Sequence, residues 1–105
     1  MSVTTQNPVC KQSLKLLGDY WTMMIIDKLT DGPRRFRDLE LLVEGVNTAT
    51  LSTRLKNMQA TGLISRNEQS RADVTYSLTD QGIQAIPVLQ AVNTYSEHVK
   101  LLTPR

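Results

Sequence analysis

The segment that decides the fold is residues 47–79, NTATLSTRLKNMQATGLISRNEQSRADVTYSLT. In its first part leucine and methionine recur at three- and four-residue steps, which predicts an amphipathic helix over about residues 47–61. Asn47 and Thr48 are expected to cap this helix, because their side chains can accept hydrogen bonds from first-turn amides. Thr61-Gly62 is expected to end it.

The second part of the segment predicts a β-hairpin. Residues 63–69 and 74–79 are the two expected strands, and the second is rich in β-branched and aromatic side chains. The polar residues 70–73 between them form the expected hairpin tip. The segment therefore predicts a helix followed at once by a hairpin.

Helical spacing of apolar residues continues on both sides of this segment. It predicts two helices over 8–17 and 20–30, and a third helix of about two turns within 36–45. It also predicts a strand stub at 34–36 and a last helix over about 80–100. The predicted fold class is mostly α with a small β-hairpin (α+β), a winged helix-turn-helix in the order α-α-β-α-α-β-β-α. Spacing and caps alone leave open a small helical domain with an incidental hairpin.

Length and composition exclude several classes of protein. The 105 residues and 11.8 kDa fit a single domain over residues 1–105, and 40% apolar with 21% charged residues is typical of a globular one. No apolar run approaches the roughly 18 residues of a membrane span, and the N-terminus does not resemble a signal peptide. We therefore expect a cytoplasmic protein with no membrane partner.

The rarity of reactive residue types argues against catalysis and metal binding. The chain has one cysteine, Cys10, and one histidine, His98, at opposite ends of the sequence. One cysteine cannot form an intrachain disulfide or a cysteine-rich zinc site. A nucleophile–base–acid set and a glycine-rich phosphate loop are both missing. We expect no enzymatic activity, no metal and no cofactor.

Positive charge is concentrated in the middle of the chain. The whole chain carries +2, from 12 basic and 10 acidic residues. Residues 34–71 contain seven basic and four acidic side chains, which gives +3, and no acid occurs between Asn47 and Arg66. Such a stripe suits a polyanionic partner, although solvated helix faces often have the same composition.

The helix predicted over about 47–61 has an outward face suited to a DNA groove. At about 100° per residue, Leu55 and Met58 fall within about 40° of Leu51 and form the core face. Small polar side chains on the opposite face could approach base edges in the major groove, and a Thr or Ala methyl could touch a thymine methyl. The outward residues are Ala49, Thr53, Lys56 and Ala60, with Ser52 and Asn57 at the flanks.

Four pieces of sequence, in order and at matching spacing, resemble one family of regulators. They are GDYWT at 18–22 followed by DGPRRF at 31–36, LSTRLK at 51–56 with GLI at 62–64, and YSLTDQG at 76–82 with Pro87. From about Asn7 to Tyr95 the chain resembles the HxlR-type regulators, a winged-helix family related to MarR. This resemblance implies a small dimeric bacterial or archaeal transcription factor that binds a pseudo-palindromic operator, a double-stranded DNA partner.

The resemblance and the charge pattern together assign candidate DNA contacts. Ala49, Ser52 and Thr53 are expected at the bases, while Asn47 and Thr48 are caps first and DNA contacts second. For the phosphates or the minor groove we expect Lys56, Arg71 at the wing tip, and at least one of Arg34, Arg35 and Arg37.

Arg54 has two competing candidate roles. It lies about 60° from the core face of its helix on a wheel with about 100° per residue. An ion pair with an acid of the preceding helix, such as Asp38 or Glu40, therefore competes equally with a phosphate contact.

The two ends of the chain are expected to form a homodimer interface. Residues 1–17 and 79–105 carry more apolar side chains than one small core can cover. Pro87 is expected to kink the last helix, which is tolerable if the far half packs across the dimer. Thr79 is expected to cap that helix.

Cys10 leaves a sensing role open. Family members that sense electrophiles or oxidants usually carry a cysteine just before the proline that opens the first helix, where this chain has Asn7. The thiol switch of the family therefore cannot simply be carried over. Packing is the favoured role for Cys10, with a redox sensor as the competing hypothesis. Two more hypotheses stand beside plain DNA binding: a small-molecule effector in an interface pocket, and a protein-interaction module.

Overall fold

The computed structural model describes residues 8–99, and up to the end of the hairpin their backbone follows the order predicted from the sequence. Helices α1 (Pro8–Leu17) and α2 (Tyr20–Leu29) are followed by α3 (Phe36–Leu42) and α4 (Thr48–Ala60). The hairpin comes next, formed by β1 (Ile64–Ser70) and β2 (Asp73–Leu78), and then α5 (Asp80–Ile83) and α6 (Ile86–Val99). The chain is mostly helical with one two-stranded antiparallel sheet, a winged helix-turn-helix.

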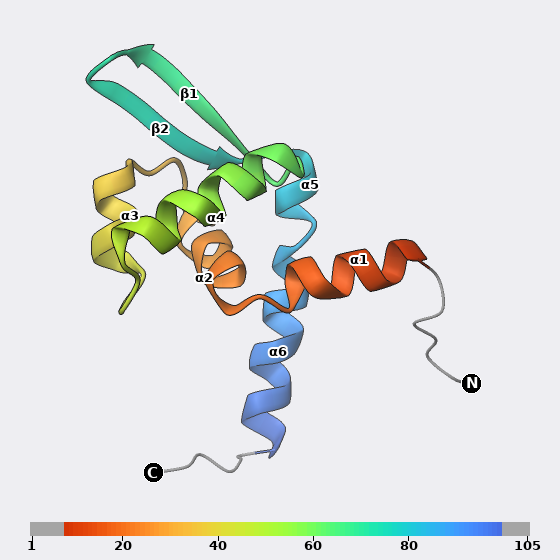
Figure 1. Cartoon of the computed structure of the whole chain (residues 1–105). Helices are drawn as coiled ribbons and strands as arrows, with labels where there is room; N and C mark the ends of the chain where they lie inside the picture. The colour runs from red at the N-terminus through yellow and green to blue at the C-terminus, as the bar shows by residue number, and fades with distance from the viewer. Residues whose placement is uncertain (1–7, 100–105) are drawn as a thin grey trace.

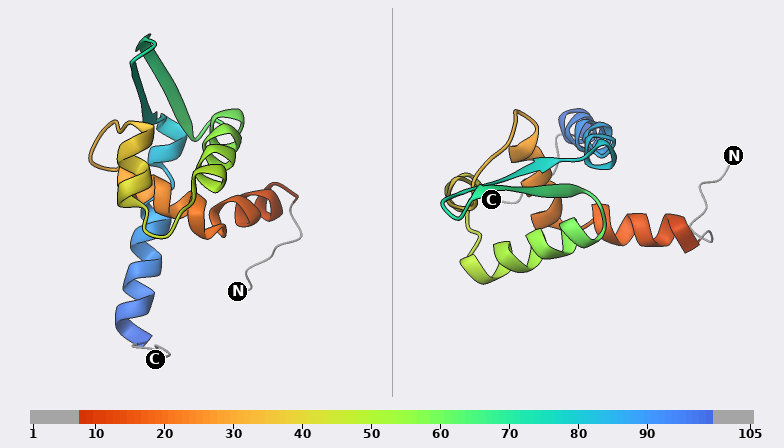
Figure 2. Two further views of the ribbon diagram at one scale, coloured as in Figure 1. Left: turned by 60° about the vertical axis from the view of Figure 1, so that its left-hand side comes forward. Right: turned by 90° about the horizontal axis from the view of Figure 1, so that it is seen from above.

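The arrangement in space separates a compact body from three projections. Helices α2, α3 and α4 pack against one another, and the hairpin projects beyond them (Figure 1). Helices α1 and α6 leave the body in other directions, away from the hairpin (Figure 2). The core draws on most elements, and its buried side chains are Met23, Ile25, Ile26, Leu29, Leu39, Val43, Leu51, Leu55, Met58, Leu63, Ile64, Tyr76 and Ala85.

The hairpin is tied to the body at its base. Ile64 pairs with Leu78, and the register shifts between Glu68 and Ser70. The predicted strand stub consists of one isolated bridge, in which the backbones of Arg34 and Tyr76 exchange hydrogen bonds of 3.0 and 2.8 Å. The tip is tighter than predicted, since only residues 71–72 lie between the strands.

The last predicted helix is divided in two. The expectation of one helix over 80–100 with a kink at Pro87 is wrong, because α5 ends at Ile83 and α6 begins at Ile86. Proline lacks a backbone N–H and would clash with a preceding helical turn, so the break falls before it. Pro87 is then the second residue of α6, where a first-turn residue needs no N–H partner. Thr79 does act as a cap, but of the one-turn helix α5.

Candidate nucleic-acid interface

The N-terminus of α4 is held by two polar side chains. Asn47 is the N-cap, and its Oδ1 accepts a hydrogen bond from the backbone N of Thr50 at 2.7 Å, as predicted. The expectation that Thr48 is also a cap is wrong. Thr48 is the first helical residue, and its Oγ1 donates to Glu40 Oε2 at 2.6 Å because that carboxylate lies within reach from α3. The side chain of Thr48 therefore joins the two helices.

Helix α4 presents one buried and one exposed face, as its spacing predicts. Leu51, Leu55 and Met58 are buried in the core. The other face is free of acidic side chains, since α4 contains no Asp or Glu. In the view from above, α4 runs along one edge of the molecule (Figure 2). The exposed residues are Ala49, Thr53, Lys56, Asn57 and Ala60, and Ser52 is half-buried.

Arg54 forms a two-point ion pair with Asp19. Its Nε lies 2.8 Å from Asp19 Oδ2 and its Nη2 lies 3.0 Å from Oδ1. The ion pair expected as one of two roles is therefore present, but Asp38 and Glu40 are not the partners. Both of these carboxylates accept hydrogen bonds at the starts of α3 and α4, whereas Asp19 comes from the turn before α2.

The ion pair determines the protonation of Asp19. The hydrogen bond from Arg54, helped by those from Thr22, holds the pKa of the Asp19 carboxyl well below its usual range, although partial burial opposes this. The pairing also raises the pKa of Arg54. Because the folded-state pKa of Asp19 lies below its unfolded value of about 4, the pair stabilises the fold above that pH. This stabilisation is lost as the pH falls through the lowered pKa.

The three arginines near the start of α3 differ in their surroundings. Arg34 is half-buried, and its Nε donates to the backbone O of Lys28 at 3.1 Å, so it closes the end of α2. Arg35 is exposed and pairs with Asp73 of β2 at 3.2 Å. Arg37 is exposed and has no ion pair among the described residues. Of the three, Arg37 is therefore the most available cation.

The wing carries two exposed arginines of different availability. Arg71 lies in the two-residue turn at the tip and forms no ion pair within residues 8–99. Arg66 in β1 pairs with Glu68 on the same strand at 2.7 Å. Lys56 on α4 resembles Arg71 in being exposed and unpaired within the same range. Among the candidate DNA contacts, Lys56, Arg37 and Arg71 are thus the cations most able to meet a polyanion.

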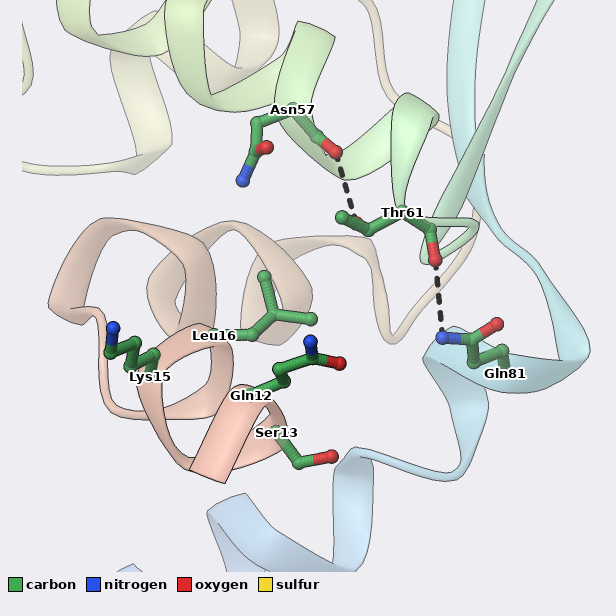
Figure 3. A pocket seen from close by; sticks show the side chains of 7 residues that line it. All are labelled: Gln12, Ser13, Lys15, Leu16, Asn57, Thr61 and Gln81. Carbon is green, nitrogen blue, oxygen red and sulfur yellow. Dashed lines mark hydrogen bonds between the residues drawn. The ribbon is translucent and has the colours of Figure 1, made fainter. Parts of the chain in front are cut away.

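A cavity opens between α1, the C-terminal end of α4 and α5 (Figure 3). Its volume is about 580 Å³. Two hydrogen bonds connect the lining residues at the end of α4 and in α5: Thr61 Oγ1 donates to Asn57 O at 2.9 Å, and Gln81 Nε2 donates to Thr61 O at 3.2 Å. The lining side chains are Gln12, Ser13, Lys15, Leu16, Asn57, Thr61 and Gln81.

Within the described residues, no group of three or more His, Cys, Asp or Glu side chains is placed to hold a metal ion. None of the helices in the same range is long and apolar enough to cross a membrane. The arrangement instead offers an exposed helix face flanked by cations on α3 and on the hairpin.

Comparison with known proteins identifies the family that has this arrangement. Residues 16–101 match the HxlR-like helix-turn-helix family.

The chain belongs to the HxlR-like helix-turn-helix family. A regulator described as an uncharacterised HTH-type transcriptional regulator of Halalkalibacterium halodurans is 40% identical over 81 residues, which cover 74% of this chain and 72% of that protein. The reduced form of the transcriptional regulator YodB from Bacillus subtilis has a similar structure, with a TM-score of 0.81 and 26% identity over 90% of this chain and 95% of that one. The quinone-bound form of YodB aligns with a TM-score of 0.77 and 27% identity, covering 87% of this chain and 97% of that chain.

These comparisons confirm the predicted family and the class of protein. This HxlR-like chain is a transcriptional regulator of a DNA-binding family, and its relatives are regulators rather than enzymes. The individual DNA contacts named from the sequence stay predictions. Asp19 is the residue missing from those predictions, because in the sequence it only lies between two predicted helices, over 8–17 and 20–30. An aspartate three residues before Thr22 is an N-cap signature, and it could have indicated at least the local role.

Proposed function

We propose that this HxlR-like regulator binds a pseudo-palindromic operator as a homodimer. Helix α4 of each protomer lies in the major groove, and the β1–β2 hairpin acts as the wing on the flanking DNA. The observation that carries the proposal is the outward face of α4, which is exposed, small and free of acids. Such a face can approach base edges closely without electrostatic repulsion from phosphates. The acid-free face also disfavours a protein-interaction module.

Two kinds of contact follow from the placement of the side chains. Ala49, Ser52 and Thr53 on α4 face the bases, because their short side chains allow the helix backbone to approach the groove. The phosphates are met by Lys56 on α4 and by Arg71 at the wing tip, both exposed. Arg37 is the first candidate among the arginines near α3, because exposed Arg35 is already paired with Asp73.

Lys56→Ala and Arg71→Ala are each expected to weaken operator binding without unfolding the protein. Each lost phosphate contact should reduce the slope of log affinity against log salt concentration by about one unit. Fluorescence anisotropy titrations of a labelled operator at several salt concentrations measure both quantities. Arg66→Ala is the matched control on the wing, because Glu68 already neutralises Arg66, and it should change the slope much less. Unchanged affinity and slope in both variants would remove Lys56 and Arg71 from the interface.

The proposed dimer uses α1 and α6, which lie within the ranges 1–17 and 79–105 expected from the sequence. Residues 1–7 and 100–105 of those ranges lie outside the described part of the chain. Helix α6 has no buried residue, yet it carries an apolar stripe, and Leu14 on α1 is also exposed. A second copy of the chain would cover these apolar side chains and place two α4 helices about 34 Å apart, one turn of DNA.

An effector is part of the proposal only in outline. YodB has been solved in a quinone-bound form, so one similar regulator binds a quinone. In this chain Asn7 lies outside the described residues, and Cys10 is half-buried in α1. A half-buried cysteine in a helix is most often a packing residue. We therefore assign Cys10 to packing, while the effector itself and the predicted cytoplasmic location stay open to test.

Cys10→Ser is expected to leave operator affinity unchanged and to alter the response to oxidant little. The reason is that a small, half-buried side chain is replaced by one of similar size on α1, a helix that the proposal does not place in the groove. Operator affinity measured before and after mild diamide treatment, in the wild type and in the variant, tests this. A large loss of affinity in the treated wild type alone would show instead that Cys10 is the switch.

A further inference from the structure

The carboxylate of Asp19 is the meeting point of several polar groups. Its Oδ2 accepts three hydrogen bonds: from the backbone N of Thr22 at 2.9 Å, from Thr22 Oγ1 at 2.8 Å, and from Arg54 Nε at 2.8 Å. Its Oδ1 accepts a fourth from Arg54 Nη2 at 3.0 Å. Thr22 is only 1% exposed, and the side chains of Asp19 and Arg54 are 29% and 31% exposed. This is a partly buried ion pair in which the carboxylate accepts four hydrogen bonds.

The place of Asp19 in the backbone gives this pair a further significance. Asp19 is the N-cap of α2, directly after the sharp turn that ends α1 at Leu17. The turn is tight at Gly18, where a Cβ atom would lie 2.6 Å from the carbonyl oxygen of Leu14. Arg54 lies near the middle of α4. One carboxylate therefore connects the corner between α1 and α2 to the helix assigned to DNA recognition.

On the N-terminal side of this corner, α1 and α4 do not pack closely against each other. The cavity of about 580 Å³ lies between them, with Gln12 and Leu16 of α1 on one side and Asn57 of α4 on the other (Figure 3). Side chains therefore do not lock α1 against the C-terminal part of α4. Leu51, Leu55 and Met58 anchor the buried face of α4, and the two-point bond to Arg54 adds a polar restraint on the rotation of the helix about its own axis.

Small rotations of α4 matter for base contacts. A rotation of about 15° moves side-chain ends by about 1.4 Å at the 5–6 Å radius of a helix. Hydrogen bonds between heavy atoms span only about 2.7–3.2 Å, so a shift of that size would break contacts from the outward face. Thr53 precedes Arg54 in α4, and holding the arginine therefore also sets the direction in which Thr53 points.

We propose that Asp19 is a positioning residue for DNA recognition: through Arg54 it fixes the rotational setting of α4, and it links the direction of α1 to that setting. Asp19 itself does not touch DNA. The inference rests on the proposed function, in which α4 is the helix that enters the major groove. It assigns to Arg54 a role inside the protein, whereas the sequence leaves a phosphate contact equally open.

The two roles of Arg54 predict opposite effects for one substitution. Asp19→Asn keeps an oxygen that can cap α2 but removes the negative charge that holds the guanidinium. If Arg54 positions α4, this variant should bind the operator about tenfold more weakly, the effect of losing roughly one good base contact. Its salt slope should stay unchanged, because no phosphate contact is lost. If Arg54 instead contacts a phosphate, releasing it should maintain or increase affinity.

Arg54→Lys provides a second, independent variant. Lysine keeps the positive charge and could still meet a phosphate, but its ammonium cannot reproduce the two-point geometry of a guanidinium. Positioning predicts a loss of about tenfold in operator affinity at unchanged salt slope. Asp27→Asn is the matched control for Asp19→Asn, because it removes one exposed carboxylate on α2 and changes the net charge by the same amount as Asp19→Asn does. This control should bind as the wild type does.

The experiment is an anisotropy titration of the full-length protein with operator and with scrambled DNA, after circular dichroism has checked folding of each variant. Weaker operator binding by Asp19→Asn and Arg54→Lys, with little change on scrambled DNA, supports the positioning role. If Asp19→Asn does not fold, the result for Arg54→Lys alone decides between the two roles of Arg54. Unchanged or tighter operator binding by the folded variants would overturn it. A wild type that binds operator and scrambled DNA equally would overturn the proposed function, and the positioning role with it.

Discussion

Gly82→Ala is expected to lower the free energy of unfolding by about 3 kcal/mol, the upper range for overpacking a close-packed interior. Gly82 is buried in α5, and a Cβ atom there would lie 2.1 Å from the carbonyl oxygen of Leu63. That carbonyl cannot move away easily, because it accepts a hydrogen bond from the backbone N of Thr79 at 3.1 Å. The added methyl group would therefore push α5 away from the base of the hairpin and disturb the wing.

Urea denaturation at a fixed protomer concentration measures this effect, since the stability of a dimer depends on concentration. Gln84→Ala is the matched control, because Gln84 follows α5 directly and its side chain is exposed. This control should stay within about 0.5 kcal/mol of the wild type. A Gly82→Ala variant as stable as the control would show that α5 does not pack on Leu63 as described.

Val92→Asp is expected to convert the dimer into monomers and to reduce operator affinity by about 100-fold or more, because a monomer loses the second half-site. Val92 and Tyr95 lie on the apolar stripe of α6 and are 56% and 63% exposed in the protomer. An aspartate placed there would bury an unpaired charge in the proposed interface. The protomer itself should stay folded, since α6 has no buried residue.

Sedimentation velocity at micromolar concentration distinguishes the two states. Thr94→Asp is the matched control, because Thr94 is exposed and lies about 200° around the helix from Val92 at 100° per residue. The control should stay dimeric and keep its operator affinity. A wild type that sediments as a monomer, and that also fails to dimerise on DNA, would refute the dimer.

The fold could be predicted from local sequence where local signals agree. In α4 the apolar period, the Asn47 cap and the ending at Thr61-Gly62 all indicate the same helix, and the structure confirms it. The observed ends of both strands differ from the predicted ends by only one residue. Alternation and β-branched content indicate where a strand lies, but they do not determine its last hydrogen-bonded residue. The last helix was predicted wrongly at Pro87, because apolar spacing continues across the break that proline requires.

The candidate site could be predicted only in part, for a different reason. Which face of α4 is exposed follows from its own spacing, so Thr53 and Lys56 were located from the sequence. Which cation has an acidic partner depends on contacts between distant segments. Arg54 pairs with Asp19, 35 residues away, and Arg35 pairs with Asp73, 38 residues away. No local pattern indicates such pairs, and the partner of Arg54 was therefore predicted in the wrong helix.

Parallel selection of genomic fragments by the purified wild type and by Thr53→Ala tests most directly whether the outward face of α4 reads DNA. The wild type should enrich one motif with two inverted half-sites about one turn, or 34 Å, apart. Thr53→Ala should enrich the same motif with relaxed preference at matching positions of both half-sites, because only the base contacts of that side chain are lost. Enrichment of no motif by the wild type, or an equal loss of affinity for every sequence in the variant, would contradict recognition by α4.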